Sequence, residues 1–215
     1  MNHSEFVHKN FRADEWESEV KAYIDNLSVP SNSLWHKETR ELQKAKEELV
    51  TLGYYVKYKY GIVDSIQFRL NPSEDAGEDG WIFQEGKQIE SVQIVIAYYD
   101  EEEAKQDELV MSGKECCPGG WTFDRLEVLT TRVEQRIHKK VEKRYTDIDT
   151  LVVGVNRWFV SSISREYSNL NKQLEQKAKA LLAKSQFKEL AIVDVDLVGK
   201  GDVWSFSNPV VQTNA

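Results

Sequence analysis

The sequence predicts an α/β (α+β) protein in which helices flank a mixed central sheet. Short apolar runs separated by turn residues between positions 63 and 99 are typical of an antiparallel meander. The apolar run 150–155 is followed by a long helical pattern and a further apolar run at 190–198. A strand–helix–strand unit of this kind predicts a right-handed crossover with parallel pairing, so the sheet should contain both strand directions.

Two helices are expected before the meander. Asp14 and Glu17 have the spacing of a capping box, and the apolar stripe around them predicts a helix over residues 14–27. A second apolar stripe predicts a helix over 34–52, which should end at Gly53 because glycine commonly follows the last helical turn.

The remaining elements follow from the periodicity of apolar residues. The expected strands cover residues 54–60, 63–70, 81–83, 89–99, 150–155 and 190–198, with an edge strand at 202–206. The expected helices of the second half cover residues 126–144 and 163–184, and a short acidic helix is expected at 100–107.

The chain is expected to form one domain with a short extension. Turn residues around Pro30 set off an N-terminal extension, residues 1–30, with one helix and a frayed start over residues 1–11. Residues 31–208 should form a single domain, and residues 209–215 a loose tail.

Composition argues against several classes of protein. A chain of 215 residues with 40% hydrophobic residues is long enough to bury one full core, and it has no apolar run long enough to span a membrane. The start of the chain does not resemble a signal peptide, and the adjacent Cys116 and Cys117 cannot build a framework of disulfides, so we expect a cytoplasmic protein. The net charge of −8 argues against a generic, strongly basic nucleic-acid binder.

Glu90 interrupts a run that is apolar enough to form a central strand. A charged side chain rarely occupies such a position without a partner or a metal ion. Asp79, at the start of the facing strand, could supply a second carboxylate. Two carboxylates that meet at a sheet are the minimum for holding Mg²⁺, or Mn²⁺ in its place, because hard cations prefer oxygen ligands. The alternative interpretation is an acid near a strand end that reaches solvent.

The order of these elements is similar to that of the restriction-endonuclease-like, or PD-(D/E)xK, nuclease superfamily. The core of that superfamily is a helix, a three-strand meander, a helix and a strand, often with a further helix and strand, which gives the order αβββαβαβ. The resemblance covers residues 34–198 and rests on element order together with a few acidic residues. It implies a Mg²⁺-dependent phosphodiesterase that acts on DNA.

The resemblance also implies roles for individual residues. Asp79 would match the first acid of the superfamily, with Asp64 as its rival, and Glu90 would match the acid of the next strand. The lysine that usually follows two residues later falls on Val92, which is a departure. Gln93 is the nearest polar residue, although in a regular strand its side chain points to the other face.

A further acid on the first core helix would match Glu38, or Glu41 in its place. Its alternative interpretation is an acid whose position in the first helical turn suits the helix dipole. The expected catalytic set is therefore Asp79, Glu90, Gln93 and Glu38, in which Asp79 and Glu90 hold the metal ion.

The helix expected at 126–144 is the most basic stretch of an acidic chain. Such a helix could follow a phosphate backbone, or it could be a solvated face whose cations suit the C-terminal end of the helix. The residues expected to contact DNA are Arg132, Arg136, Lys140 and Lys143.

Two functions are therefore expected as alternatives. The first is a DNA nuclease of a defence, phage or mobile-element system, for which a homodimer would explain cleavage of both strands. The second is a catalytically inactive protein on the same scaffold that binds a protein partner as an inhibitor or regulatory subunit. Val92 at the lysine position and the net charge of −8 favour the second function, whereas an acid at position 90 and the basic helix favour the first.

Overall fold

The protein is described by a computed structural model. The described residues are 3–26, 45–73, 77–97, 123–143, 145, 147–155, 164–194 and 203–212.

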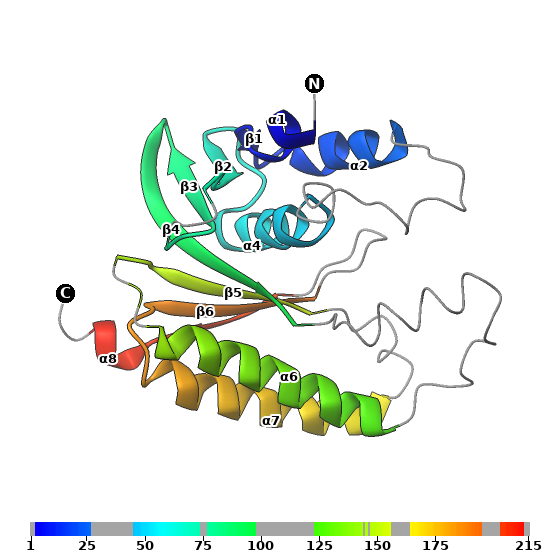
Figure 1. Cartoon of the computed structure of the whole chain (residues 1–215), viewed down its shortest axis with the longest axis vertical. Coiled ribbons are helices and arrows are strands. Elements are labelled where there is room, and N and C mark those ends of the chain that lie inside the picture. The colour runs from blue at the N-terminus through cyan, green and yellow to red at the C-terminus, as the bar shows by residue number, and fades with distance from the viewer. Residues whose placement is uncertain are drawn as a thin grey trace.

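These residues form one seven-stranded sheet in which each strand lies beside its neighbours in sequence, in the order β1-β2-β3-β4-β5-β6-β7 (Figure 1). The strands are β1 (Phe11–Arg12), β2 (Ile66–Leu70), β3 (Gly80–Gln84), β4 (Lys87–Ile96), β5 (Thr150–Val155), β6 (Glu189–Asp194) and β7 (Val203–Ser207). β1 to β4 pair antiparallel, β4, β5 and β6 pair parallel, and β7 is antiparallel to β6. The predicted mixed sheet is confirmed.

Helices cover both faces of the sheet (Figure 1). On one face lie α1 (His3–Val7), α2 (Trp16–Asn26), a π-helical turn η1 (Ala45–Leu49) and α4 (Val50–Tyr60). On the other face lie α6 (Phe123–Glu142) and α7 (Ser164–Leu182), each of which connects two parallel strands; a last short helix, α8, covers Pro209–Gln212. A separate hydrophobic core fills the space on each face. None of the helices in the described part of the chain is long and apolar enough to cross a membrane.

The later predicted elements correspond to observed ones. The strands expected at 63–70, 81–83, 89–99, 150–155, 190–198 and 202–206 correspond to β2 to β7, and the helices expected at 126–144 and 163–184 correspond to α6 and α7. The acidic helix expected at 100–107 lies outside the described residues.

The N-terminal segment is part of the folded core, which corrects the expectation that it is frayed. β1 pairs with β2, so Phe11 lies opposite Phe68. Phe6 and Phe11 are buried, and the Phe6 ring stacks on Tyr23 of α2 with 3.8 Å between ring centroids. These apolar side chains belong to the same hydrophobic core as β2 and α4. Burial of their aromatic rings stabilises the segment in the folded structure.

The strand expected at 54–60 is wrong, because these residues belong to α4. The helix passes through Gly53 and ends at Tyr60, and Gly61 follows it with a φ of 79°, a backbone conformation that favours glycine. Lys57 and Lys59 alternate with apolar residues in a way that resembles a strand, but both stand on the last turns of a helix whose first half is buried. Gly53 instead allows a close contact, since a Cβ there would lie 2.7 Å from ring carbons of Trp16.

We predict that Gly53→Ala destabilises the protein by about 1–2 kcal/mol, even though alanine favours a helix by about 1 kcal/mol over glycine. The added methyl group would overlap the Trp16 ring, and urea unfolding measures the change in unfolding free energy. In a Trp16→Phe background the smaller ring leaves room, so the same substitution should be neutral or stabilising. An equal effect in both backgrounds would contradict this packing account.

Candidate functional site

Polar side chains gather at two places on opposite faces of β4. Glu90 and Val92 point to the face covered by α4, whereas Gln93 points to the face covered by α6, because side chains alternate along a strand. We call Glu90 and the side chains that contact its carboxylate the Glu90 cluster: Tyr55, Lys59, Tyr60, Glu90 and Thr150, with Glu189 bound to the same lysine. We call Asp79, Gln93, Lys140 and Tyr145 the Asp79 cluster.

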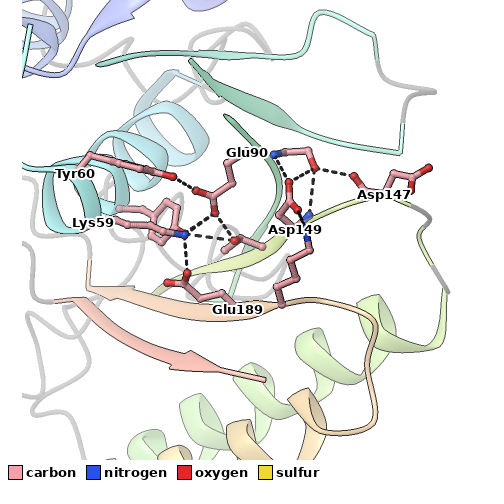
Figure 2. A network of polar contacts seen from close by, with 10 residues as sticks. Lys59, Tyr60, Glu90, Asp147, Asp149 and Glu189 are labelled. Atoms are coloured by element: carbon pink, nitrogen blue, oxygen red, sulfur yellow. Dashed lines mark hydrogen bonds and ion pairs between the residues drawn. The ribbon is translucent and has the colours of Figure 1, made fainter. Parts of the chain in front are cut away.

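The Glu90 carboxylate is buried and saturated with donors (Figure 2). Its side chain is 3% exposed, and Oε1 accepts hydrogen bonds from the hydroxyl of Tyr55 at 2.7 Å and from that of Thr150. Oε2 accepts a hydrogen bond from the hydroxyl of Tyr60. Three hydroxyl groups on α4 and β5 therefore replace the water that this carboxylate loses on burial.

Lys59 neutralises the buried carboxylate. Its Nζ lies 3.0 Å from Oε1 of Glu90 and 2.6 Å from Oε2 of Glu189, so one ammonium group joins β4 to β6 (Figure 2). Burial opposes the charged form of Lys59, but the two glutamates outweigh it and raise its pKa above the ordinary 10.5. Burial, together with the charge of Glu90, raises the pKa of Tyr55 and Tyr60 above the ordinary 10.0.

A third acid lies where β4 and β5 run side by side, beyond Glu90 in Figure 2. Asp149 accepts hydrogen bonds from the backbone N–H of Ser91 at 2.9 Å and from Lys188 at 2.6 Å. Burial alone would raise the pKa of Asp149, but the hydrogen bonds from Lys188 and Ser91 hold it below its usual value. These contacts tie the start of β5 to β4 and leave Asp149 fully paired.

Asp79 lies just before the start of β3 and caps the edge of β4 there. Because β3 begins at Gly80, the next N–H of β4, that of Ile94, has no partner on β3, and Oδ2 of Asp79 accepts it at 2.8 Å. The same oxygen accepts a hydrogen bond from Nε2 of Gln93. Lys140 of α6 brings its Nζ to 3.9 Å from this oxygen. The Asp79 side chain remains 31% exposed, so the Asp79 cluster is open to solvent.

The Asp79 cluster holds two titratable groups with perturbed pKa values. Burial lowers the pKa of Lys140, and the nearby charges of Lys143 and Lys139 act in the same direction, whereas Asp79 and Glu48 act against it. Burial and the charge of Asp79 raise the pKa of Tyr145, whose ring lies 5.6 Å from Nζ of Lys140. Perturbed groups of this kind are typical of functional sites, although ion-pair networks also produce them.

Gln93 leaves one oxygen unused. Its side chain is buried, with 2% of the residue exposed, and within the described structure its amide oxygen Oε1 has no hydrogen-bond partner. Gln93 donates through Nε2 to Asp79, so exchanging the amide O and N would abolish that bond. A buried acceptor beside a carboxylate is a pair of oxygens that suits a hard cation.

The structure does not bring Asp79 and Glu90 together. The two carboxylates make separate sets of hydrogen bonds on opposite faces of β4, and Glu90 is paired with Lys59. Among the described residues, no group of three or more His, Cys, Asp or Glu side chains is placed to hold a metal ion. The structure instead brings Asp79, Gln93 and Lys140 together, three residues predicted for the site but assigned to different roles.

The other predicted residues fall elsewhere. Glu38 and Glu41 lie outside the described residues. Asp64, the rival of Asp79, is exposed in the turn before β2. Arg132 and Arg136 continue the row of Lys140 along one side of α6, at the four-residue spacing that places side chains on one helix face. Lys143 extends that row and is exposed.

The sequence interpretation missed Tyr55, Lys59 and Tyr60, because it assigned them to a strand. On a helix, Tyr55 and Lys59 are four residues apart and share a face, so a helical interpretation of this segment would have placed a lysine beside a tyrosine on the side that covers the sheet. Glu189 was missed because it stands at the first position of β6, where an acid is unremarkable.

Comparison of the chain with known protein families, with curated proteins and with solved structures finds no match.

We predict that unfolding free energy falls as pH rises above about 10, by about 1.4 kcal/mol per pH unit for each proton retained. Tyr55, Lys59 and Tyr60 have raised pKa values, so the folded protein keeps protons that the unfolded chain releases. Urea unfolding measured across this range gives the slope. Tyr55→Phe should flatten it, whereas Tyr58→Phe, at a side chain of α4 that is 53% exposed, should not. Identical slopes in the two variants would disprove this origin.

Proposed function

We propose that the chain is a Mg²⁺-dependent phosphodiesterase that cleaves DNA at the Asp79 cluster. One observation carries the proposal: the Asp79 carboxylate contacts the amide of Gln93, whose buried oxygen has no hydrogen-bond partner among the described residues. The Lys140 ammonium lies 3.9 Å from the same carboxylate. A carboxylate and an amide oxygen can hold Mg²⁺, and a nearby cation can stabilise charge on a phosphate, so this set of groups suits metal-assisted phosphodiester hydrolysis.

Two protein oxygens fit Mg²⁺ because this ion usually keeps several waters and takes only one or two carboxylates from the protein. Asp79 and Oε1 of Gln93 would hold the ion, which lowers the pKa of a bound water and neutralises charge on the scissile phosphate. Gln93 then takes the place of the acid that the nuclease resemblance assigned to Glu90. The saturated hydrogen bonds of Glu90 support a structural role for that residue instead.

Lys140 supports the proposal from a different element. The resemblance implies a lysine on β4 at position 92, where this chain has a buried valine. Lys140 reaches the same region from α6, and its lowered pKa reflects burial among neighbouring cations. An ammonium group at this position would hold a phosphate oxygen and stabilise the charge that develops on it during cleavage.

The basic row of α6, which we define as Arg132, Arg136, Lys140 and Lys143, leads to the Asp79 cluster. Its members follow one side of the helix, and Lys140 belongs to both the row and the cluster. Cations in a row can neutralise successive phosphates of a DNA backbone, which would bring a phosphodiester bond to Asp79.

A specific observation favours the second candidate function, a catalytically inactive protein that binds a protein partner. Both predicted metal ligands face a lysine, Glu90 at 3.0 Å and Asp79 at 3.9 Å, and the chain carries a net charge of −8. An acidic protein whose site carboxylates are already neutralised would resemble an inhibitor or regulatory subunit more than an enzyme.

We predict that the wild-type protein nicks supercoiled plasmid DNA when Mg²⁺ or Mn²⁺ is present, and that Asp79→Asn lowers the rate by about 100-fold or more, because it removes the charged ligand. Gln93→Leu should also lower the rate. Gel electrophoresis of the plasmid products measures cleavage over time.

Glu189→Gln is the matched control for that experiment, since it removes a carboxylate from the opposite face of the sheet and should leave the rate unchanged. Absence of cleavage by folded wild-type protein on supercoiled, linear and single-stranded DNA would exclude the nuclease and favour the protein-binding function.

We predict that Arg136→Gln weakens binding to duplex DNA and makes the slope of log K against log salt concentration about 0.9 less negative, because one phosphate contact is lost. Fluorescence anisotropy at several salt concentrations, in EDTA, gives this slope. Lys21→Gln, at an exposed position of α2 on the other face, should bind as the wild type does. Equal slopes for the two variants would remove α6 from the interface.

A further inference from the structure

We infer that the outer face of β2 and β3, built around Arg69, Trp81 and Phe83, binds the unpaired bases of single-stranded DNA beside the Asp79 cluster. This inference rests on the proposed function for the identity of the ligand as DNA, and it specifies the form of the substrate.

The face is defined by strand alternation. In β2 and β3 the side chains of Phe68 and Ile82 are buried in the core under α4, so Arg69, Trp81 and Phe83 point to the opposite side. Arg69 lies directly opposite Trp81 in the register of the two strands. All three outward side chains are only partly buried.

Of the helices that the structure describes, those on this side of the sheet leave β2 and β3 uncovered. α6 and α7 lie against β4, β5 and β6, and Figure 1 shows both helices below that half of the sheet, while β2 and β3 lie at its other end. A β-bulge between Ile82 and Phe83 interrupts the pairing with β4 and leaves Ile89 41% exposed on the adjoining strand. An apolar surface that helices do not cover is a candidate binding surface.

The guanidinium and the two aromatic rings of this face suit a ligand that carries both negative charge and flat rings. The Arg69 guanidinium lies over both aromatic rings, with Cζ 5.0 Å from the centroid of Trp81 and 5.4 Å from that of Phe83. Its Nε is buried and has no hydrogen-bond acceptor among the described residues. Bases stack on aromatic rings and on guanidinium planes, and a guanidinium also binds phosphate, so one strand of nucleic acid satisfies all three groups.

The face continues into the proposed site. Trp81 is two residues after Asp79, and Gly80 between them pairs with Val92, one residue before Gln93. A strand stacked on Trp81 would therefore pass its backbone next to Asp79 and the basic row of α6. Paired bases cannot stack on a protein surface in this way, because their faces are already covered inside the duplex, so the face favours an unpaired strand.

The test is binding of a fluorescein-labelled oligothymidine of about 16 nucleotides, measured by anisotropy in EDTA so that no cleavage occurs. The same strand annealed to its oligodeoxyadenosine complement provides the duplex. We expect tighter binding of the single strand, and Trp81→Ala should weaken it by about 5- to 150-fold while changing duplex binding by less than about twofold. Trp81→Phe, which keeps an aromatic ring, should retain most of the affinity.

Two further variants complete the test: one changes a second residue of this face, and the other changes an exposed aromatic residue elsewhere. Arg69→Gln keeps both rings and should make the salt slope for the single strand about 0.7 less negative. Tyr58→Ala removes an exposed aromatic ring from α4, on the opposite side of the sheet, and should bind as the wild type does. Equal binding of single strand and duplex, or unchanged single-strand binding by folded Trp81→Ala and Arg69→Gln, would overturn the inference.

This measurement is separate from the test of catalysis. Trp81-dependent binding by a protein that cleaves nothing would support the inference and reject the nuclease. Cleavage of DNA by the wild type with no effect of Trp81→Ala on single-strand binding would support the nuclease and reject the inference.

Discussion

The burial of the Glu90 carboxylate is the constraint on which the rest of the structure depends. A charged group at the centre of a sheet is stable only if every lost water is replaced, and here Tyr55, Tyr60 and Thr150 replace them while Lys59 supplies the opposite charge. Because these partners come from α4 and β5, and Lys59 also binds Glu189 of β6, the network joins one helix to three strands. Removal of one partner from such a buried ion pair costs about 3–5 kcal/mol. A shift of α4 that moved its side chains away from Glu90 would lose the same contacts, so the network fixes the position of α4 over the sheet.

That position has consequences on the other face. With Glu90 fully paired under α4, strand alternation directs Gln93 to the side of α6. There β3 begins only at Gly80 and does not reach Ile94, so Asp79 caps the N–H of Ile94 and accepts a hydrogen bond from Gln93. The two polar clusters thus have different roles. The Glu90 carboxylate is buried and saturated with donors, whereas the Asp79 carboxylate is partly exposed and the Gln93 amide that contacts it keeps an unused oxygen. The Glu90 carboxylate already has its donors, whereas the Gln93 oxygen has no partner among the described residues, which is why the proposed chemistry moves from Glu90 to Gln93.

Much of the fold was predictable from periodicity, and the failures have a common physical reason. β5 and the centre of β6 are apolar runs, β4 is largely apolar apart from a few polar residues such as Glu90 and Gln93, and α6 and α7 have strong apolar stripes. Each of these elements was therefore recognisable by itself. In α4, by contrast, Tyr54, Tyr55 and Val56 are all buried, so the segment lacks the one-sided stripe by which a surface helix is recognised. Glycine often marks the end of a helix, but Gly53 lies inside this one because the Trp16 ring leaves no space for a Cβ there.

For the site, the residue types were evident from the chain and their grouping was not. An acid at position 90 within an apolar strand indicated a buried charge in need of a partner, and the basic character of α6 was equally plain, because both are local properties of the sequence. Which carboxylate meets which cation depends on the pairing of strands and the position of helices that are far apart in the chain. Lys59 reaches Glu90 across 31 residues and Lys140 reaches Asp79 from another layer of the fold, and such contacts arise only when the sheet and its helices pack together.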